Sequence, residues 1–220
     1  MNQFITKYSS VNILSKALYK ACAALIRDFN EMHTLSNLKR NNFAKISISR
    51  AKNKIKDFIC LSVENEKWEM QISGIHNFIS GIPFFSMSAK LYRENEITVV
   101  TIDPFHNEIF WAVEEQGAYF RHAKAQVSSQ NSIERGTLII PSPHINVNKV
   151  IKQIRCLGNT ELGLAYLSIG RVDGILVEGE VMSNLLATES GAVSTKITLH
   201  QKEYTLFSNQ FLLKHYADMF

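Results

Sequence analysis

The period of the hydrophobic residues changes within the first hundred positions, and this change constrains the fold more than any other feature. Over residues 14–29, apolar side chains recur every three or four positions, which predicts a helix with one buried face, capped by Ser10. A second helix is expected over residues 49–60, with its lysines outward. From Phe85 the pattern alternates with a period of two, and residues 97–102 form a β-branched run, which predicts two paired antiparallel strands. The alternation places three apolar side chains on one face of that sheet: Phe85, Met87 and Ala89.

The rest of the chain continues to mix strands and helices. Strands are expected over residues 108–114, 137–140, 175–177 and 195–199, with a short segment at 118–120, and helices are expected over residues 147–154, 159–170 (capped by Asn159) and 183–190. No linker rich in Gly, Pro or Ser and no repeat of fixed period interrupts this order. We therefore expect a layered α/β (α+β) fold in a single domain over residues 1–220, with halves at about 1–135 and 136–220.

The composition is typical of a globular protein. Of the 220 residues, 45% are hydrophobic, and 24 Lys and Arg against 20 Asp and Glu give a net charge of +4, which excludes the disordered and collagen-like classes. No apolar run approaches the roughly 18 residues that a membrane helix needs, and the first ten residues lack the apolar centre of a secretory signal. We therefore expect a cytoplasmic protein with no membrane partner. The three cysteines are odd in number and lack metal-type spacing, so we expect them to be inert.

The positive charge is concentrated between Glu31 and Asp57, where no acidic residue occurs. Such a run is typical of a solvated helix face with its preceding loop, which is the favoured interpretation, and the alternative is a site for phosphate on RNA or on a small anion. Only Phe43 offers an aromatic ring in this window, so the base-stacking part of a single-strand site is missing. If the window binds a polyanion, the residues that would do so are Lys39, Arg40, Lys45, Arg50, Lys52, Lys54 and Lys56.

Residues 72–84 read I-S-G-I-H-N-F-I-S-G-I-P-F, which resembles the D-P-x-D-G-T-x-N-F signature of the inositol monophosphatase family and the G-x-P that follows it. Later blocks fall in the order of that family: R-C-L-G-N at 155–159, L-A-Y at 164–166, G-R-V-D-G at 170–174 and T-E-S-G-A-V at 188–193. The chain thus resembles this family, in its bacterial SuhB-like branch, from the first helix onward. The resemblance implies a layered αβαβα fold and a homodimer.

The same resemblance identifies a degenerate active site. Family members bind Mg²⁺ through the two aspartates of the signature, the backbone carbonyl between them and an upstream Glu. Here the aspartate positions read Met70 and Ser73, and the motif Thr that positions the attacking water reads Ile75. A thioether and a neutral hydroxyl are poor substitutes for carboxylate oxygens on a hard cation, so no metal cofactor is expected. The vestigial positions are Met70, Ile72 (through its carbonyl), Ser73, Gly74 and Ile75.

A few acidic residues remain near the family positions. Glu64 and Glu66 fall where the upstream metal ligand is expected, and they are weak candidates for a rebuilt metal site. Glu178 is a weak candidate for the substrate-orienting Glu, reached by a one-residue slip from Val177. The W-D-x-A block of the family is replaced by residues 179–184, which contain neither Trp nor Asp.

Two hypotheses of function follow from this resemblance. The first is a protein that keeps the fold but has lost most metal ligands, and that acts as a catalytically inactive binding or interaction partner. Because some bacterial relatives are connected with transcription, RNA or the transcription machinery is the partner that this hypothesis implies. The alternative is an active Mg²⁺-dependent phosphomonoesterase, acting on inositol monophosphate or a similar small phosphate ester, in which paired metals activate the attacking water.

Overall fold

The computed structural model describes residues 5–63, 65–147 and 150–220. In chain order, its elements are α1 (Ser9–Met32), α2 (Asn37–Ser62), β1 (Lys67–Ser73), α3 (Ile75–Ser80), β2 (Ser86–Arg93), β3 (Glu96–Asp103), β4 (Glu108–Val113), β5 (Gly117–Phe120), β6 (Ala123–Lys124), β7 (Thr137–Ile139), β8 (Gln153–Arg155), α4 (Thr160–Ser168), β9 (Gly174–Glu178), α5 (Asn184–Glu189), β10 (Val193–Leu199), β11 (Lys202–Ser208) and α6 (Leu213–Ala217).

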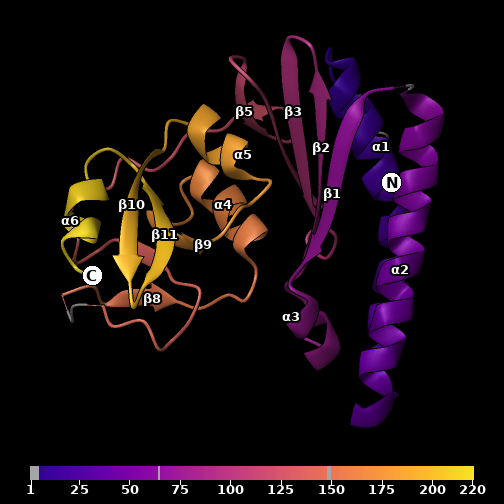
Figure 1. Ribbon diagram of the computed structural model, residues 1–220, viewed down its shortest axis with the longest axis horizontal. Coiled ribbons are helices and arrows are strands. Elements are labelled where there is room, and N and C mark those ends of the chain that lie inside the picture. The colour runs from indigo at the N-terminus through magenta and orange to yellow at the C-terminus, as the bar shows by residue number, and fades with distance from the viewer. Residues whose placement is uncertain (1–4, 64, 148–149) are drawn as a thin grey trace.

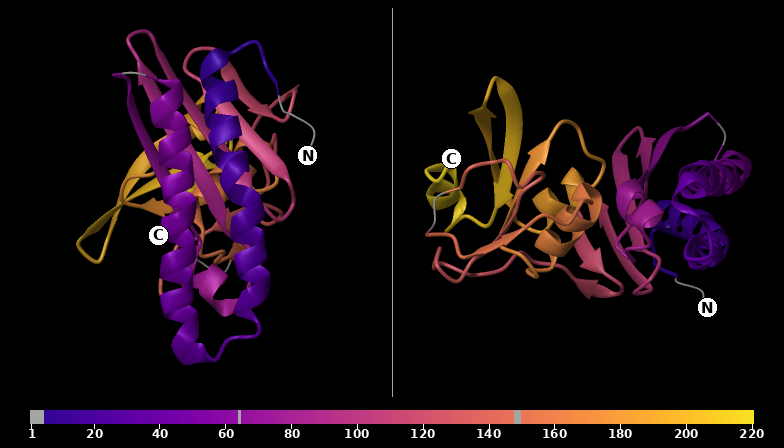
Figure 2. Two further views of the ribbon diagram at one scale, coloured as in Figure 1. Left: turned by 90° about the vertical axis from the view of Figure 1, so that its right-hand side faces the viewer. Right: turned by 90° about the horizontal axis from the view of Figure 1, so that it is seen from below.

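These elements stack in five layers along the long axis of the molecule (Figure 1). From right to left in that view, the antiparallel pair α1 and α2 covers a six-stranded sheet, α4 and α5 form the middle layer, and a five-stranded sheet is followed by α6. Turned by 90°, the long helices α1 and α2 lie side by side in front of the first sheet (Figure 2, left). The predicted layered αβαβα fold is therefore confirmed.

The first sheet is an antiparallel meander with the strand order β1-β2-β3-β4-β5-β6, which leaves β1 at one edge. In its register, Met70 lies opposite Ala89 and Ile72 lies opposite Met87. The side chains of Phe85, Met87 and Ala89 all lie in the core beneath α1 and α2. The prediction that they share one face is confirmed.

The second sheet has the order β10-β11-β9-β7-β8, in which β7 pairs in parallel with β8 and β9, and the other pairs are antiparallel. β8 and β9 lie on either side of β7, and the crossover connection between them contains α4. Both sheets thus flank α4 and α5, and this arrangement brings the loop after β9 close to the edge of the first sheet.

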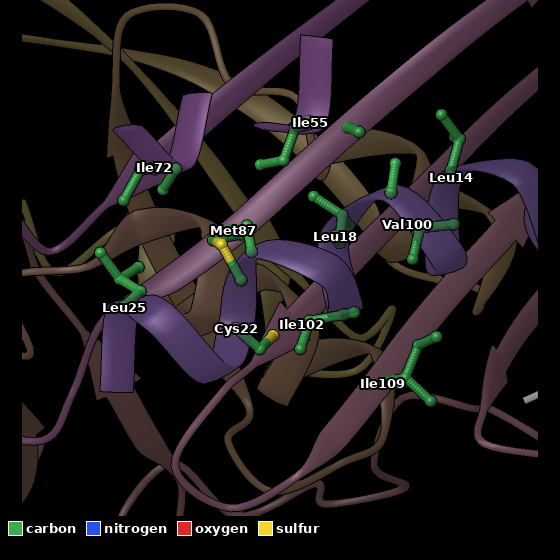
Figure 3. Close-up of a cluster of buried hydrophobic side chains, with 14 of the residues drawn as sticks. Leu14, Leu18, Cys22, Leu25, Ile55, Ile72, Met87, Val100, Ile102 and Ile109 are labelled. Atoms are coloured by element: carbon green, nitrogen blue, oxygen red, sulfur yellow. The ribbon is translucent and has the colours of Figure 1, made fainter. Parts of the chain in front are cut away.

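The largest core lies between the first helix pair and the first sheet (Figure 3). Leu14, Leu18 and Leu25 of α1 meet Ile55 of α2 and side chains of four strands there, all nearly inaccessible to solvent. Smaller cores fill the remaining three interfaces between layers. No helix in the described part of the chain is long and apolar enough to cross a membrane.

The boundaries of the first two helices differ from those predicted. Ser10 does not cap α1, because the helix begins at Ser9 and the Ser10 hydroxyl donates to Oε1 of Glu96 at 2.6 Å. α2 begins at Asn37, twelve residues before the predicted start at Ser49. Its buried positions are partly small or polar, such as Ala44 and Ser47, and this weakens the hydrophobic period.

The predicted helix over residues 147–154 is wrong for the residues that the structure describes, since Gln153–Arg155 is the strand β8 beside β7; positions 148 and 149 lie outside the described residues. The strand β11 was not predicted at all. It pairs with β10 across a turn in which His200 and Gln201 both have positive φ, and neither is the Gly or Asn that usually signals such a turn.

Candidate functional site

The vestigial motif lies at the turn from β1 into α3. Gly74 adopts φ +80, in the left-handed region, and a Cβ at this position would come within 2.6 Å of the Phe84 carbonyl oxygen. The turn therefore requires glycine for both its backbone angle and its space. The residue after it, Ile75, exposes 39% of its surface, so an apolar side chain stands where the resemblance implies a water-positioning Thr.

The side chains at two vestigial positions belong to the core. Met70 is half-buried and packs against the core beneath α1 and α2, and Ile72 is only 5% exposed in the same cluster. Alternation along β1 puts the intervening Gln71 on the opposite side, where it borders a cleft. Met70 also borders that cleft, but its side chain contributes a thioether to a hydrophobic cluster rather than an oxygen to a metal site.

The remaining acidic candidates are engaged with cationic side chains. Oε1 of Glu66 accepts from Nε of Arg93 at 3.0 Å, and Glu178 lies on the surface, where it accepts from Nζ of Lys202 at 2.7 Å. Glu64 lies outside the described residues. Among the described residues, no group of three or more His, Cys, Asp or Glu could hold a metal ion. The side chains that stand at the family's ligand positions therefore do not fit Mg²⁺.

A cleft of about 590 Å³ opens beside the edge of the first sheet. One wall is formed by β1 and β2, and the other by β10, β11 and the loop after β9. Burial raises the pKa of Tyr92 in the first wall, and the carboxylates of Glu69 and Glu180 raise it further. The cleft is lined by Glu69, Met70, Gln71, Lys90, Tyr92, Gly179, Glu180, Val181, Met182, Asn184, Lys196, Thr205 and Phe207.

A buried carboxylate holds the loop that forms one wall of this cleft. Glu161, in the first turn of α4, is 1% exposed, and its two oxygens accept the backbone N–H groups of Met182 at 2.9 Å and Ser183 at 2.8 Å. Sequence reasoning missed this residue. An acidic residue in the first turn after the cap Asn159 is an ordinary helix signal, and nothing in the spacing indicates a partner 21 positions away.

Two asparagines in the family-like blocks join the halves of the site. Nδ2 of Asn77 donates to the carbonyls of Phe84 and Leu157, both at 2.8 Å. Asn159 caps α4 by accepting from the Leu162 N–H at 3.1 Å, as predicted, and accepts from the Ser86 hydroxyl at 3.1 Å. These side chains fix the turn at Gly74 against the start of α4, so the retained motif residues hold the architecture together.

The basic residues of the predicted polyanion site all lie on or beside α2. Six of the seven are exposed, and the seventh, Arg40, is half-buried and donates through Nε to the Leu35 carbonyl at 3.1 Å. Residues 32–56 contain no acidic side chain. In the folded protein, however, Arg50 donates to the buried carboxylate of Asp28 on α1 at 2.8 Å. The expectation of seven uncompensated cations is therefore wrong for Arg50.

No family model matches the chain. Among curated proteins, it is 30% identical over 159 residues to Nus factor SuhB of Buchnera aphidicola, a match that covers 62% of this chain and 59% of that relative. It is 26% identical to inositol-1-monophosphatase of Rhizobium meliloti, with 84% of each chain covered. Among solved structures, the extragenic suppressor protein suhB from Bartonella henselae superposes with a TM-score of 0.81 at 21% identity, covering 97% of this chain and 98% of that one. At 21% identity, the similarity to this solved structure supports the fold alone.

Proposed function

The chain belongs to the inositol monophosphatase family, and from this premise we propose that it is a member without hydrolytic activity that acts as a binding protein, with RNA or the transcription machinery as its partner. The observation that carries the proposal is the replacement of two carboxylates at the metal-binding turn. Met70 and Ser73 occupy those positions, and the Met70 side chain is committed to the core beneath the helices.

The chemistry of the donor set supports the loss of hydrolysis. Mg²⁺ requires about six oxygen ligands in near-octahedral geometry and parts with its water reluctantly. The turn from β1 into α3 offers a thioether, a neutral hydroxyl and backbone carbonyls, and none of them neutralises a divalent charge. Glu66 already pairs with Arg93, so recruiting its carboxylate would break that ion pair.

Two observations support a nucleic-acid-linked role. The Buchnera relative carries the name Nus factor SuhB, which is linked to transcription. This chain has a long helix, α2, with exposed lysines along it, and lysines that contact phosphates release counterions from a nucleic acid. The core that α2 shares with α1 and the first sheet, together with the ion pair between Arg50 and Asp28, would present this helix in a fixed orientation.

The alternative, an active Mg²⁺-dependent phosphomonoesterase, is favoured by one observation. The cleft beside β1 persists, and Glu69 and Glu180 line it. Glu69 is engaged, however, since it accepts from the Tyr92 hydroxyl at 3.2 Å and lies 3.4 Å from Nζ of Lys67. Two carboxylates, one of them paired, fall short of the ligand set that a two-metal mechanism needs.

Calorimetric titration of the purified protein with Mg²⁺ and Mn²⁺ tests the proposal. We expect no saturable heat of binding at millimolar metal, because the site lacks the required oxygens. Saturable binding of one or two ions per chain that disappears in Glu66→Gln would support a rebuilt metal site and the phosphatase alternative. The variant Glu203→Gln, which removes a surface carboxylate paired with Lys196, serves as the matched control.

A further inference from the structure

Three cationic side chains of α1 form a row on the solvent side of the helix. Lys16, Lys20 and Arg27 are separated by four and seven residues, so they lie on one helix face, opposite the buried positions. All three are exposed. At about 1.5 Å per residue, the row is roughly 16 Å long. We call it the α1 row.

A second row runs along the outer flank of α2. Lys45, Lys52 and Lys56 are separated by seven and four residues, are exposed, and again span roughly 16 Å at about 1.5 Å per residue. We call this the α2 row. Because α1 and α2 are antiparallel neighbours, the two rows run along the same outer layer of the molecule (Figure 2, left).

Two further cations of α2, Arg50 and Lys54, lie beside the α1 row at the groove between the helices. Lys20 and Lys54 line a shallow pocket of about 370 Å³ in that groove together with the acidic Asp57, and the Lys20 ammonium lies 4.2 Å from the centre of the Phe58 ring. Farther along, Arg27 and Arg50 both bond the carboxylate of Asp28, at 3.1 and 2.8 Å. The α1 row thus continues into Arg50 and Lys54 on the groove side of α2, and the α2 row adds cations on the opposite flank of that helix.

The charge of this layer exceeds that of the whole protein. Residues 9–62 carry ten Lys and Arg and three acidic residues, a net charge of +7, whereas the whole chain carries +4. Two of the three acids are already engaged, because Asp28 is buried between two arginines and Glu31 lies 3.8 Å from Arg27. A strong positive potential over one face attracts a polyanion.

We propose that the outer face of α1 and α2 binds the phosphate backbone of a double-stranded nucleic acid. This inference rests on the nucleic-acid role proposed above, and it extends the site from α2 to α1 and specifies a duplex. The α1 row lies opposite the buried positions of α1, and the α2 row lies on the flank of α2 that is turned away from α1, so the cations present one broad face rather than a single groove. A broad face of this kind suits the surface of a duplex, which carries one negative charge per about 1.7 Å of its axis.

The aromatic residues of this face argue against a single strand as the ligand. Proteins that bind single strands stack bases on accessible rings. On α2, Phe43 and Phe58 are half-buried against the core, and Lys20 covers the Phe58 ring. A duplex keeps its bases stacked internally and offers only phosphates and groove edges, which cationic rows contact without base recognition. We therefore expect little sequence specificity.

Fluorescence anisotropy with a 20-bp RNA duplex, a DNA duplex of the same sequence and a 20-nucleotide uridine strand tests this proposal over a series of salt concentrations. The α1 variant carries Lys16→Gln, Lys20→Gln and Arg27→Gln, which leaves Asp28 paired with Arg50. The α2 variant carries Lys45→Gln, Lys52→Gln and Lys56→Gln. The control removes three exposed lysines elsewhere, with Lys124→Gln, Lys152→Gln and Lys214→Gln.

We expect the wild-type protein to prefer a duplex over the uridine strand. Each helix variant should weaken duplex binding about tenfold or more and lower the salt slope by about 2 to 3, since each lost phosphate contact removes close to one unit. The control, with the same change in net charge, should bind within about twofold of the wild type. Comparison of the affinities for the RNA duplex and the DNA duplex shows which of the two nucleic acids the protein prefers.

Several outcomes would overturn the inference. Duplex binding unaffected by the α1 variant would confine the site to α2, and equal losses in the control would indicate a general charge effect. Preference for the uridine strand, or binding only to anionic lipid vesicles, would contradict the duplex assignment and leave the absence of hydrolysis untouched. No binding to any nucleic acid would also contradict the proposed nucleic-acid role. Unchanged melting temperatures of the variants establish that they fold.

Discussion

Arg50 of α2 donates to the buried carboxylate of Asp28 on α1 at 2.8 Å, and this ion pair fastens the two long helices to one another. Asp28 is 2% exposed, whereas the Arg50 side chain is half exposed. The pair therefore places a buried negative charge beneath a surface on which Lys and Arg outnumber acidic residues. It stabilises the helix layer and reduces the positive potential of the outer face at the same time.

Replacing Asp28 with Asn should separate these two effects. The substitution removes the charge from two hydrogen bonds to arginines, and we expect a loss of about 1–3 kcal/mol in the free energy of unfolding. Duplex binding should tighten, because the net charge of the face rises by one. Urea unfolding and anisotropy measure the two quantities. An unchanged stability, or weaker binding in a folded variant, would contradict this account of the pair.

Glu161 should matter more for stability than its position in a short helix suggests. In Glu161→Ala, the N–H groups of Met182 and Ser183 lose their acceptors, and each unsatisfied buried donor costs about 1–3 kcal/mol. Glu161→Gln retains one carbonyl oxygen and should lose less. Hydrogen exchange should show faster exchange at these two amides in the alanine variant. Equal protection in the variant and the wild type would contradict the assignment.

The sequence predicted the elements with a strong period and missed those whose stability comes from distant contacts. Alternation from Phe85 onward identified the sheet and its buried face, and Asn159 indicated the start of α4. The first turns of α2 contain the fully exposed Leu38 and few large buried side chains, so no period is visible there. The pairings of Asp28 and of Glu161 join residues 22 and 21 positions apart, which local patterns cannot reveal.

The candidate site was predicted only as a set of replaced side chains. The resemblance identified the turn at Gly74 and the loss of its carboxylates. It could not indicate that Met70 packs into the core or that Glu66 pairs with Arg93, because both depend on the register between β1 and β2 and on the hairpin that follows.

The retained motif glycine provides a direct test of its structural role. Gly74→Ala combines a left-handed backbone with a Cβ placed 2.6 Å from the Phe84 carbonyl oxygen. Gly179→Ala, at φ +77, has no atom within 4 Å of the added Cβ and serves as the matched control. We expect about 1–2 kcal/mol of destabilisation at Gly179 from the backbone alone and a clearly larger loss at Gly74. Equal losses in chemical denaturation would contradict the close approach.

The ion pair between Glu108 and Arg171 should make stability sensitive to acid. Hydrogen bonds from the Arg171 guanidinium, at 2.5 and 2.6 Å, hold the pKa of Glu108 below its usual range, and His106 and Arg121 lower it further. The pKa of Glu108 is lower in the folded protein than in the unfolded chain. The ion pair therefore contributes fully to the free energy of unfolding above about pH 4.5, and this contribution is lost as the pH falls through the pKa of the folded protein. The stability difference between wild type and Glu108→Gln should therefore shrink from pH 6 to pH 3.5. A difference that is constant or grows would contradict this.

The central claim, that the fold persists without hydrolysis, is tested most directly by the turnover of inositol 1-phosphate at millimolar Mg²⁺, measured with and without EDTA. The account predicts release of phosphate at the rate of the buffer alone, unchanged by the metal or by the chelator. The double variant Glu64→Gln and Glu66→Gln controls for the remaining carboxylates near the old ligand position. EDTA-sensitive turnover by the wild type that disappears in this variant would contradict the account and establish an active, rebuilt metal site.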